Sequence, residues 1–159
     1  MKTWVCATIG GIGGAVAALF GGWDASIETL ILFMAIDYIS GLLVAGVFHA
    51  SEKTPGGGLE SRAGWKGLCR KGMTLLIVLV GARLDVVTGL TYIRDAVCIA
   101  YIANEAISIT ENAGLMGLPL PAIIKRTIDV LQAKADSAAA AVPDPEGQHQ
   151  QTQKGAGNE

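Results

Sequence analysis

The apolar residues of this chain gather in long runs instead of alternating with polar ones. Each run is close to the length at which a helix crosses a hydrocarbon core about 30 Å thick, which takes about 20 residues. Three such runs are present, at residues 3–23, 29–48 and 72–93, and a fourth, weaker one lies at residues 96–110. The pattern therefore predicts an all-α integral membrane protein, a small bundle of three to four transmembrane helices with a C-terminal amphipathic helix and a disordered tail.

The expected boundaries follow from where these runs end. A transmembrane domain at residues 1–118 would contain spans at about 4–20, 27–48, 72–88 and 93–111. Proline residues then break the chain, and Ile124, Ile128 and Leu131 form one face of an amphipathic helix, expected in the cytoplasm at residues 119–135 and either on the membrane surface or capping the bundle. Residues 136–159 are rich in Ala, Pro, Gly and Gln, which predicts disorder.

The orientation follows from the basic residues. The segment between the second and third runs holds Lys53, Arg62, Lys66, Arg70 and Lys71, whereas residues 21–28 hold only Asp24 and Glu28. Positively charged loops stay on the cytoplasmic side, so both the N-terminus and the C-terminus are expected there.

The fourth run decides between three spans and four. A fourth span at this position would keep Lys125, Arg126 and Lys134 in the cytoplasm, as the positive-inside rule favours, so four spans are preferred. The charged residues of the span at 93–111, Arg94, Asp95 and Glu105, would each cost about 2.5–3.5 kcal/mol at a helix centre and less near an end, so an interfacial position is the alternative. For the first run the alternative is a cleaved signal peptide, because residues 15–17 read Ala-Val-Ala.

Composition and motifs argue against an enzyme. The chain is 51% hydrophobic and 16% charged. Its three cysteines, Cys6, Cys69 and Cys98, are far apart and form no metal-binding pair. No dinucleotide, phosphate-loop, serine-hydrolase or zinc-protease motif is present. We expect no catalytic residues, no metal and no cofactor.

Small residues mark two candidate packing faces. Gly10 and Gly14 form a GxxxG pair with Ala18 one turn later, and Gly41 and Ala45 share a face of the second run with Asp37. Such faces let helix backbones approach closely, either within one chain or between copies of it.

Polar residues inside the runs are the candidates for a pore or a buried ion pair. Asp37 lies near the middle of the second run and cannot face lipid cheaply, and Arg83 is a candidate partner for it or for Asp85. The fourth run adds Asn104, Glu105 and Ser108. Spacing of three or four places Glu105, Ser108 and Asn112 on one helical face, which would line a pore or contact another subunit. The alternative is that Glu105, Ser108 and Glu111 cap and brace the end of a helix.

Three motifs in this order resemble the toxin-secretion/phage-lysis holin family. The C-terminal one runs from Asn104 and Glu105 through Ser108 to Glu111 and Asn112, followed by Gly117, Pro119 and Pro121. The others are Asp37-Tyr38-Ile-Ser-Gly41 and Lys66-Gly67-Leu68-Cys-Arg70-Lys71, and the likeness covers about residues 3–132.

The resemblance implies a phage or prophage holin, a multi-pass protein of the bacterial cytoplasmic membrane. Such a protein forms homo-oligomers with membrane lipids around them, opens lesions at a set time and lets an endolysin, or in some relatives a toxin, leave the cell. An endolysin, and in some systems an antiholin, would be the partners, with no nucleic acid involved. A small transporter or channel and a membrane scaffold for a soluble partner are the alternatives.

Overall fold

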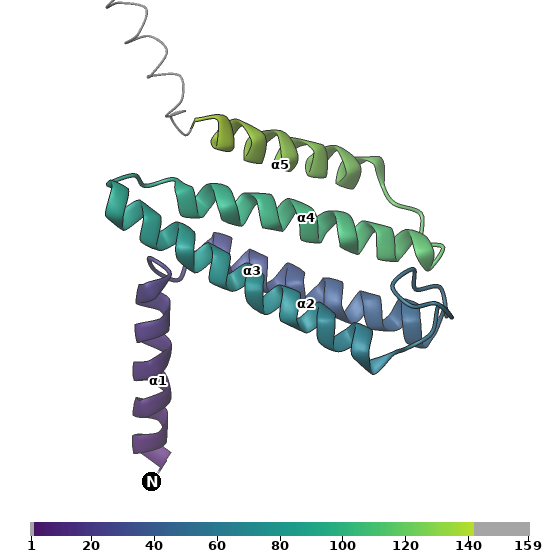
Figure 1. Ribbon diagram of the computed structural model, residues 1–159, viewed down its shortest axis with the longest axis horizontal. Coiled ribbons are helices and arrows are strands. Elements are labelled where there is room, and N and C mark those ends of the chain that lie inside the picture. Colours follow the sequence, from purple (N-terminus) through teal and green to yellow (C-terminus); the bar gives the residue numbers. More distant parts are fainter. Residues whose placement is uncertain (1, 142–159) are drawn as a thin grey trace, which may run out of the picture.

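The computed structural model describes residues 2–141, which form five helices and contain no strand (Figure 1). This confirms the predicted all-α class. The helices are α1 (Lys2–Leu19), α2 (Ala25–Gly46), α3 (Ser61–Thr88), α4 (Ile93–Leu115) and α5 (Ala122–Ala140).

Local sequence explains where several helices begin and end. The carboxylate of Asp24 accepts hydrogen bonds from the backbone N–H groups of Ser26 and Ile27 and so caps the start of α2. Gly89 and Gly117 follow the ends of α3 and α4 with φ values of 73° and 77°, a left-handed conformation that glycine adopts without strain.

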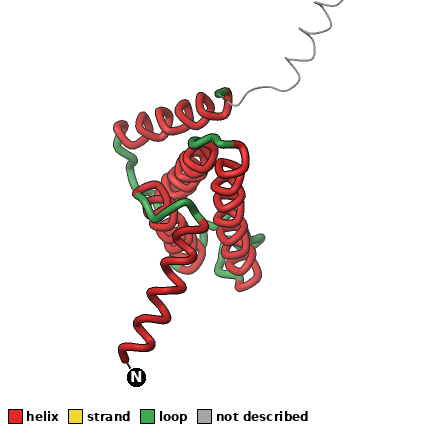
Figure 2. Tube along the Cα trace, turned by 90° about the vertical axis from the view of Figure 1, so that its left-hand side faces the viewer, coloured by secondary structure: helices red, strands yellow, loops and turns green. Residues whose placement is uncertain are grey.

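Helix α4 is the centre of the bundle. It packs against α2, α3 and α5, while α1 touches only the edge of α3 and projects away from the other helices (Figures 1 and 2). One end of the bundle carries the α1–α2 linker and the α3–α4 turn, and the other carries the 47–60 loop and the α4–α5 turn (Figure 1).

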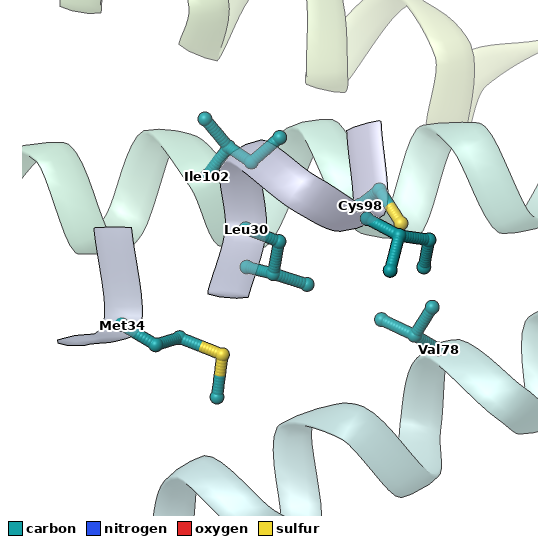
Figure 3. Close-up of a cluster of buried hydrophobic side chains, with 6 residues drawn as sticks. Leu30, Met34, Val78, Cys98 and Ile102 are labelled. Atoms are coloured by element: carbon teal, nitrogen blue, oxygen red, sulfur yellow. The ribbon is translucent and has the colours of Figure 1, made fainter. Parts of the chain in front are cut away.

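The hydrophobic core lies where α2, α3 and α4 meet (Figure 3). It is formed by Ile27, Leu30 and Met34 from α2, Val78 from α3, and Cys98 and Ile102 from α4. Gly81 allows this approach, because a Cβ placed there would lie 3.3 Å from the Cα of Arg94 on α4. The core therefore holds α3 and α4 together at the end of the bundle that carries Arg94.

Large apolar side chains also cover the outside of α2 and α3. Ile39 is 57% exposed and Val80 55%, and many others on the two helices are similar. By length and composition one described helix, Ala25–Gly46, could cross a membrane, and the shorter apolar stretch Cys6–Leu19 lies in α1. The count of three to four spans remains a prediction.

Two helices extend beyond the segments expected from the sequence. Helix α3 begins at Ser61, before the expected membrane span at 72–88, because hydropathy marks where charges stop and not where a helix starts. Helix α5 runs to Ala140, past both the expected end at residue 135 and the expected start of disorder at residue 136. The rest of the tail expected to be disordered, residues 142–159, lies outside the described residues.

Helix α5 lies along α4 (Figure 1). Ile128 is buried and Leu131 packs against the core, as expected for the predicted apolar face, whereas Ile124 remains 44% exposed. The helix therefore covers the side of the bundle in this structure.

Candidate functional site

A cleft of about 1080 Å³ with many charged residues in its walls opens between α2, α3 and α4 at the end of the bundle that carries the 47–60 loop. Helix α3 supplies a basic wall and α4 a wall of carboxylate, amide and hydroxyl groups. The lining residues that belong to the sequence motifs are Asp37, Tyr38 and Gly41 of α2, Lys66, Arg70 and Lys71 of α3, and Asn104, Glu105, Ser108, Glu111 and Asn112 of α4.

Five of the side chains lining or bordering this cleft form a network, here called the Asp37 cluster: Asp37, Ser40, Lys71, Glu105 and Asn112. The Nζ atom of Lys71 lies 2.8 Å from Oδ2 of Asp37 and 2.5 Å from Oε2 of Glu105. The amide of Asn112 donates to Oδ1 of Asp37 at 3.0 Å and to the hydroxyl of Ser40 at 2.8 Å. Ser40 in turn donates to the Asp37 carbonyl.

The charged side chains of this cluster are mostly buried, so each depends on its partners. The side chains of Asp37 and Glu105 are 11% and 8% exposed, and that of Lys71 is 13% exposed. Charges taken out of water are tolerated only when they are paired and hydrogen-bonded, and within the described residues no buried side-chain nitrogen or oxygen lacks a partner. Two carboxylates share one ammonium, so Lys71 links all three helices of the cleft.

The three sequence motifs meet at this cleft. Asp37, Tyr38 and Gly41 come from the first, Lys66 to Lys71 from the second, and residues 104–112 from the third. Gly64 and Gly67 of α3 lie against the Tyr38 ring, where a Cβ would be 3.6 and 3.9 Å from its atoms. The rest of the third motif, Gly117, Pro119 and Pro121, forms the turn between α4 and α5.

The candidate packing faces are used differently. On α2, Gly41 lies opposite Asn112, because a Cβ added at Gly41 would be 3.8 Å from Nδ2 of that side chain, and Ala45 is buried, so this face packs inside the chain. On α1, a Cβ at Gly10 or Gly14 would meet nothing within 4 Å, and Ala18 is exposed. Within the described residues the α1 face therefore has no neighbour.

Arg83 and Asp85 do not join the Asp37 cluster. Arg83 is exposed and pairs with neither carboxylate. Asp37 pairs with Lys71 instead, and Asp85 accepts hydrogen bonds from backbone N–H groups. The carboxylate of Asp85 accepts from the N–H groups of Ile93 and Arg94, both at 2.9 Å, and so caps α4.

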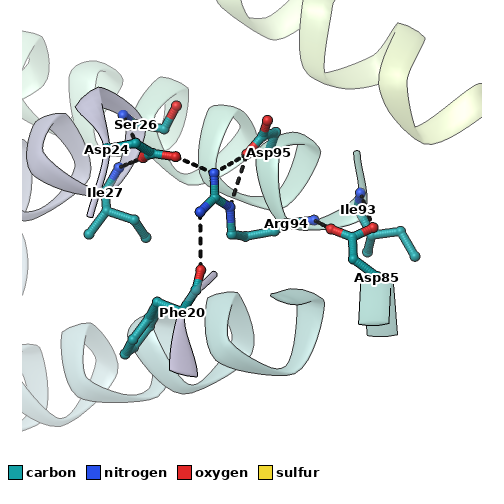
Figure 4. Close-up of polar contacts among 8 residues, drawn as sticks. All are labelled: Phe20, Asp24, Ser26, Ile27, Asp85, Ile93, Arg94 and Asp95. Carbon is teal, nitrogen blue, oxygen red and sulfur yellow. Dashed lines mark hydrogen bonds and ion pairs between the residues drawn. The ribbon is translucent and has the colours of Figure 1, made fainter. Parts of the chain in front are cut away.

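A second network, here called the Arg94 cluster, consists of Asp24, Asp85, Arg94 and Asp95 with the carbonyl of Phe20 (Figure 4). The guanidinium of Arg94 pairs with Asp24, lies 2.7 Å from Asp95 and donates to the Phe20 carbonyl at 3.1 Å. It thus ties the α1–α2 linker to the start of α4. Burial raises the pKa of Asp24, but hydrogen bonds from Ile27 and Arg94 outweigh that effect and leave its pKa lowered.

The role of Lys71 and the Arg94–Asp24 pair do not follow from the sequence pattern. Hydropathy assigns Lys71 to the basic loop because the apolar run begins at residue 72, whereas this lysine lies in the third turn of α3. The usable signal is a lysine directly before an apolar run, in a chain whose other apolar runs contain carboxylates with no evident partner in the sequence. Among the described residues, no group of three or more His, Cys, Asp or Glu side chains is arranged to hold a metal ion.

Comparison with known proteins points the same way as the motifs. Residues 14–133 match the model of the bacteriophage holin family. The chain is 37% identical over 126 residues to the uncharacterized protein Lin0175 of Listeria innocua, which covers 79% of this chain and 84% of that protein. It is 32% identical over 111 residues to a protein of Bacillus phage phi105 named "Probable holin", covering 69% and 76% of the two chains. No solved structure matches it.

The family match spans most of the chain and includes the cleft and all three of its motifs. It confirms the family resemblance seen in the sequence, and the family suggests a membrane protein without catalytic activity. The chain belongs to the bacteriophage holin family.

Proposed function

We propose that this protein is a phage or prophage holin that accumulates in the bacterial cytoplasmic membrane, forms homo-oligomers and opens lesions through which an endolysin or a toxin leaves. The observation that carries the proposal is the Asp37 cluster, a buried set of charges at the meeting point of the three family motifs. Buried charge in an apolar bundle is expensive, so it indicates a functional role.

The outer surface supports insertion into a bilayer. Large exposed apolar side chains on α2 and α3 include Ile39, Leu76 and Val80, whereas the large exposed apolar residue of α4 is Leu115 at its end. A contiguous surface of this kind is rare on soluble monomers and normal against lipid. We propose that α2 and α3 face lipid while α4 is covered by protein.

We propose four spans, α1 to α4, with the 47–60 loop and the N-terminus in the cytoplasm. The 28 residues of α3 measure about 42 Å at 1.5 Å per residue, which exceeds a hydrocarbon core of about 30 Å. Its first turns, with Arg62 and Lys66, would then lie among the lipid headgroups, as the positive-inside rule favours.

The Asp37 cluster would hold α2, α3 and α4 of one protomer together, both before and after the lesion opens. Lys71 pairs with both Asp37 and Glu105 within one protomer and offsets only one of their two charges, but all three groups lie inside the bundle, so they present no charge to lipid at that depth. In an oligomer that opens, the cleft beside these groups and Arg83 would face water. The membrane barrier would be kept until protomers assemble, which suits a protein that accumulates harmlessly before acting.

Self-association would begin at α1. Its face of Gly10, Gly14 and Ala18 has no neighbour within the described part of the chain and suits close helix contact. We predict that Gly14→Leu blocks oligomer formation without preventing membrane insertion, because the leucine fills the contact. Crosslinking in isolated membranes measures this, with Gly13→Leu, on a different face of the same helix, as the matched control. Equal crosslinking in the wild type and both variants would remove α1 from the contact.

Expression in a bacterium with and without a cytoplasmic endolysin tests the function itself. We expect a delay, then an abrupt loss of membrane potential, with lysis only when endolysin is present. Solute-specific leakage without endolysin release would indicate a transporter or channel. Continued growth without leakage would indicate a membrane scaffold.

A further inference from the structure

Helix α5 has a charged outer face along most of its length. Ile128 is buried and Leu131 packs on the core, so one stripe of the helix fastens it to the bundle. The exposed charged side chains on its other sides are Lys125, Arg126, Asp129, Lys134 and Asp136, with the apolar Ile123 and Val130 exposed among them. The docked helix therefore presents charge outward.

The helix also extends from one end of the bundle to the other. It starts beside the α4–α5 turn, and its end is tied to the opposite end of the bundle by a hydrogen bond from the Tyr92 hydroxyl to the Ala141 carbonyl, at 3.2 Å. Its 19 residues measure about 28 Å, close to the thickness of a hydrocarbon core. A docked α5 thus reaches as deep as the helix it covers.

Water already has room at the seam between α4 and α5. A cavity of about 380 Å³ there is lined by three alanines and Ile107 together with the polar side chains of Asn104, Gln132 and Asp136. The three polar side chains at this seam suit a surface beside an aqueous space better than one against lipid.

The two sides of the bundle are consequently unlike. The outer faces of α2 and α3 are apolar, with Leu32 at 54% and Val80 at 55% exposure, whereas the α5 side carries five exposed charges. If α4 lies in the membrane, a helix docked along it cannot turn these charges toward hydrocarbon. They require water or another polar protein surface.

We infer that the arrangement in which α5 is docked on α4 is that of the open lesion, with the charged face of α5 lining its aqueous lumen and the outer faces of α2 and α3 against lipid. This inference rests on the proposed function. The sequence-based expectation of a cytoplasmic α5 would then describe the protein before the lesion forms, with α5 joining the bundle as the lesion opens.

A crosslink that fixes α5 to α4 tests this. Ala103→Cys and Ala135→Cys place thiols on the two walls of the same small cavity, in the full-length chain with the exposed Cys6 and Cys69 changed to serine and the buried Cys98 retained. The double variant is reconstituted into liposomes that contain a fluorescent protein the size of an endolysin. It is then oxidised, and the two single variants serve as matched controls.

We expect the oxidised double variant to release the cargo at least as fast as its reduced form. Release that is abolished by oxidation and restored by reduction, with both single variants unaffected, would overturn the inference, because α5 must then leave α4 for the lesion to open. Failure of the reduced protein to release cargo would instead count against the proposed function.

Spin labels on the crosslinked protein give the second reading. A label at Asp129 on α5 should be accessible to a water-soluble nickel relaxation reagent, and a label at Val80 on α3 to oxygen dissolved in lipid. The reverse pattern would overturn the inference, because the apolar side would then line the lumen.

Discussion

The two polar clusters of the bundle use similar residues in different environments. In the Asp37 cluster both carboxylates and the ammonium are close to fully buried. In the Arg94 cluster the guanidinium side chain is 13% exposed, but its partners Asp24 and Asp95 are 40% and 48% exposed. Exposed ion pairs contribute little to stability, whereas a buried charge that loses its partner is strongly destabilising.

The clusters also join different parts of the chain. The Asp37 cluster connects the middles of helices through side chains 34 or more positions apart in sequence. The Arg94 cluster connects helix ends, by capping α2 and α4 and by holding the Phe20 carbonyl of the linker. The first therefore controls whether three helices stay together, and the second controls how they are connected.

The largest effect is expected from Lys71→Met. It leaves Asp37 and Glu105 buried without their cation and should lower the free energy of unfolding by about 3–5 kcal/mol. Circular dichroism during an SDS titration in mild detergent measures it, with Lys66→Met on the exposed part of α3 as the control. Adding Asp37→Asn and Glu105→Gln should recover part of the loss. An equal loss in Lys71→Met and Lys66→Met would mean that the buried pairing of Lys71 adds no stability beyond that of an exposed lysine.

A smaller effect is expected from Asn112→Ala. Removing its amide leaves one oxygen of Asp37 and the Ser40 hydroxyl without that donor, which should cost about 1–3 kcal/mol in the same titration. Asn104→Ala changes the same residue type on the exposed wall of the cleft and should cost far less. Equal losses would argue that cleft hydration, not the buried bond, sets the stability.

Much of this architecture is accessible from sequence, since apolar runs identify helices and a mid-run carboxylate such as Asp37 must turn inward. Which side chain pairs with Asp37 cannot be predicted from the sequence in the same way. Hydropathy does not fix how far one helix slides along another, so Arg83 and Lys71, twelve positions apart on α3, could not be ranked. The position of α5 is similarly open, because an amphipathic face indicates that a helix covers something apolar without saying whether this is the bundle or the membrane.

Arg94→Gln should have a modest effect on stability and a clearer one on geometry. Its partners are partly exposed, so the loss in free energy of unfolding should be about 1 kcal/mol or less. Without the bond to the Phe20 carbonyl, the linker that holds α1 is less restrained. The distribution of distances between spin labels on α1 and α4 should broaden in Arg94→Gln and stay unchanged in the control Arg83→Gln. An unchanged distribution in Arg94→Gln would show that the glycine-containing linker is rigid by itself.

The smallest effect is expected from Asp24, and its sign follows from its pKa. That pKa is lowered in the folded protein from an ordinary value near 3.8, because hydrogen bonds from Ile27 and Arg94 outweigh the effect of burial. Ionised Asp24 therefore contributes stability above about pH 4, and that contribution is lost as the pH falls through the folded-state pKa. Asp24→Asn keeps a side chain that can cap α2 and removes only the charge, so the difference in unfolding midpoint between the two proteins should be present at pH 7 and shrink toward pH 3. A difference that stays constant over this range would assign the role of Asp24 to capping alone, and the contrast with the charge-dependent Asp37 cluster would then be sharper still.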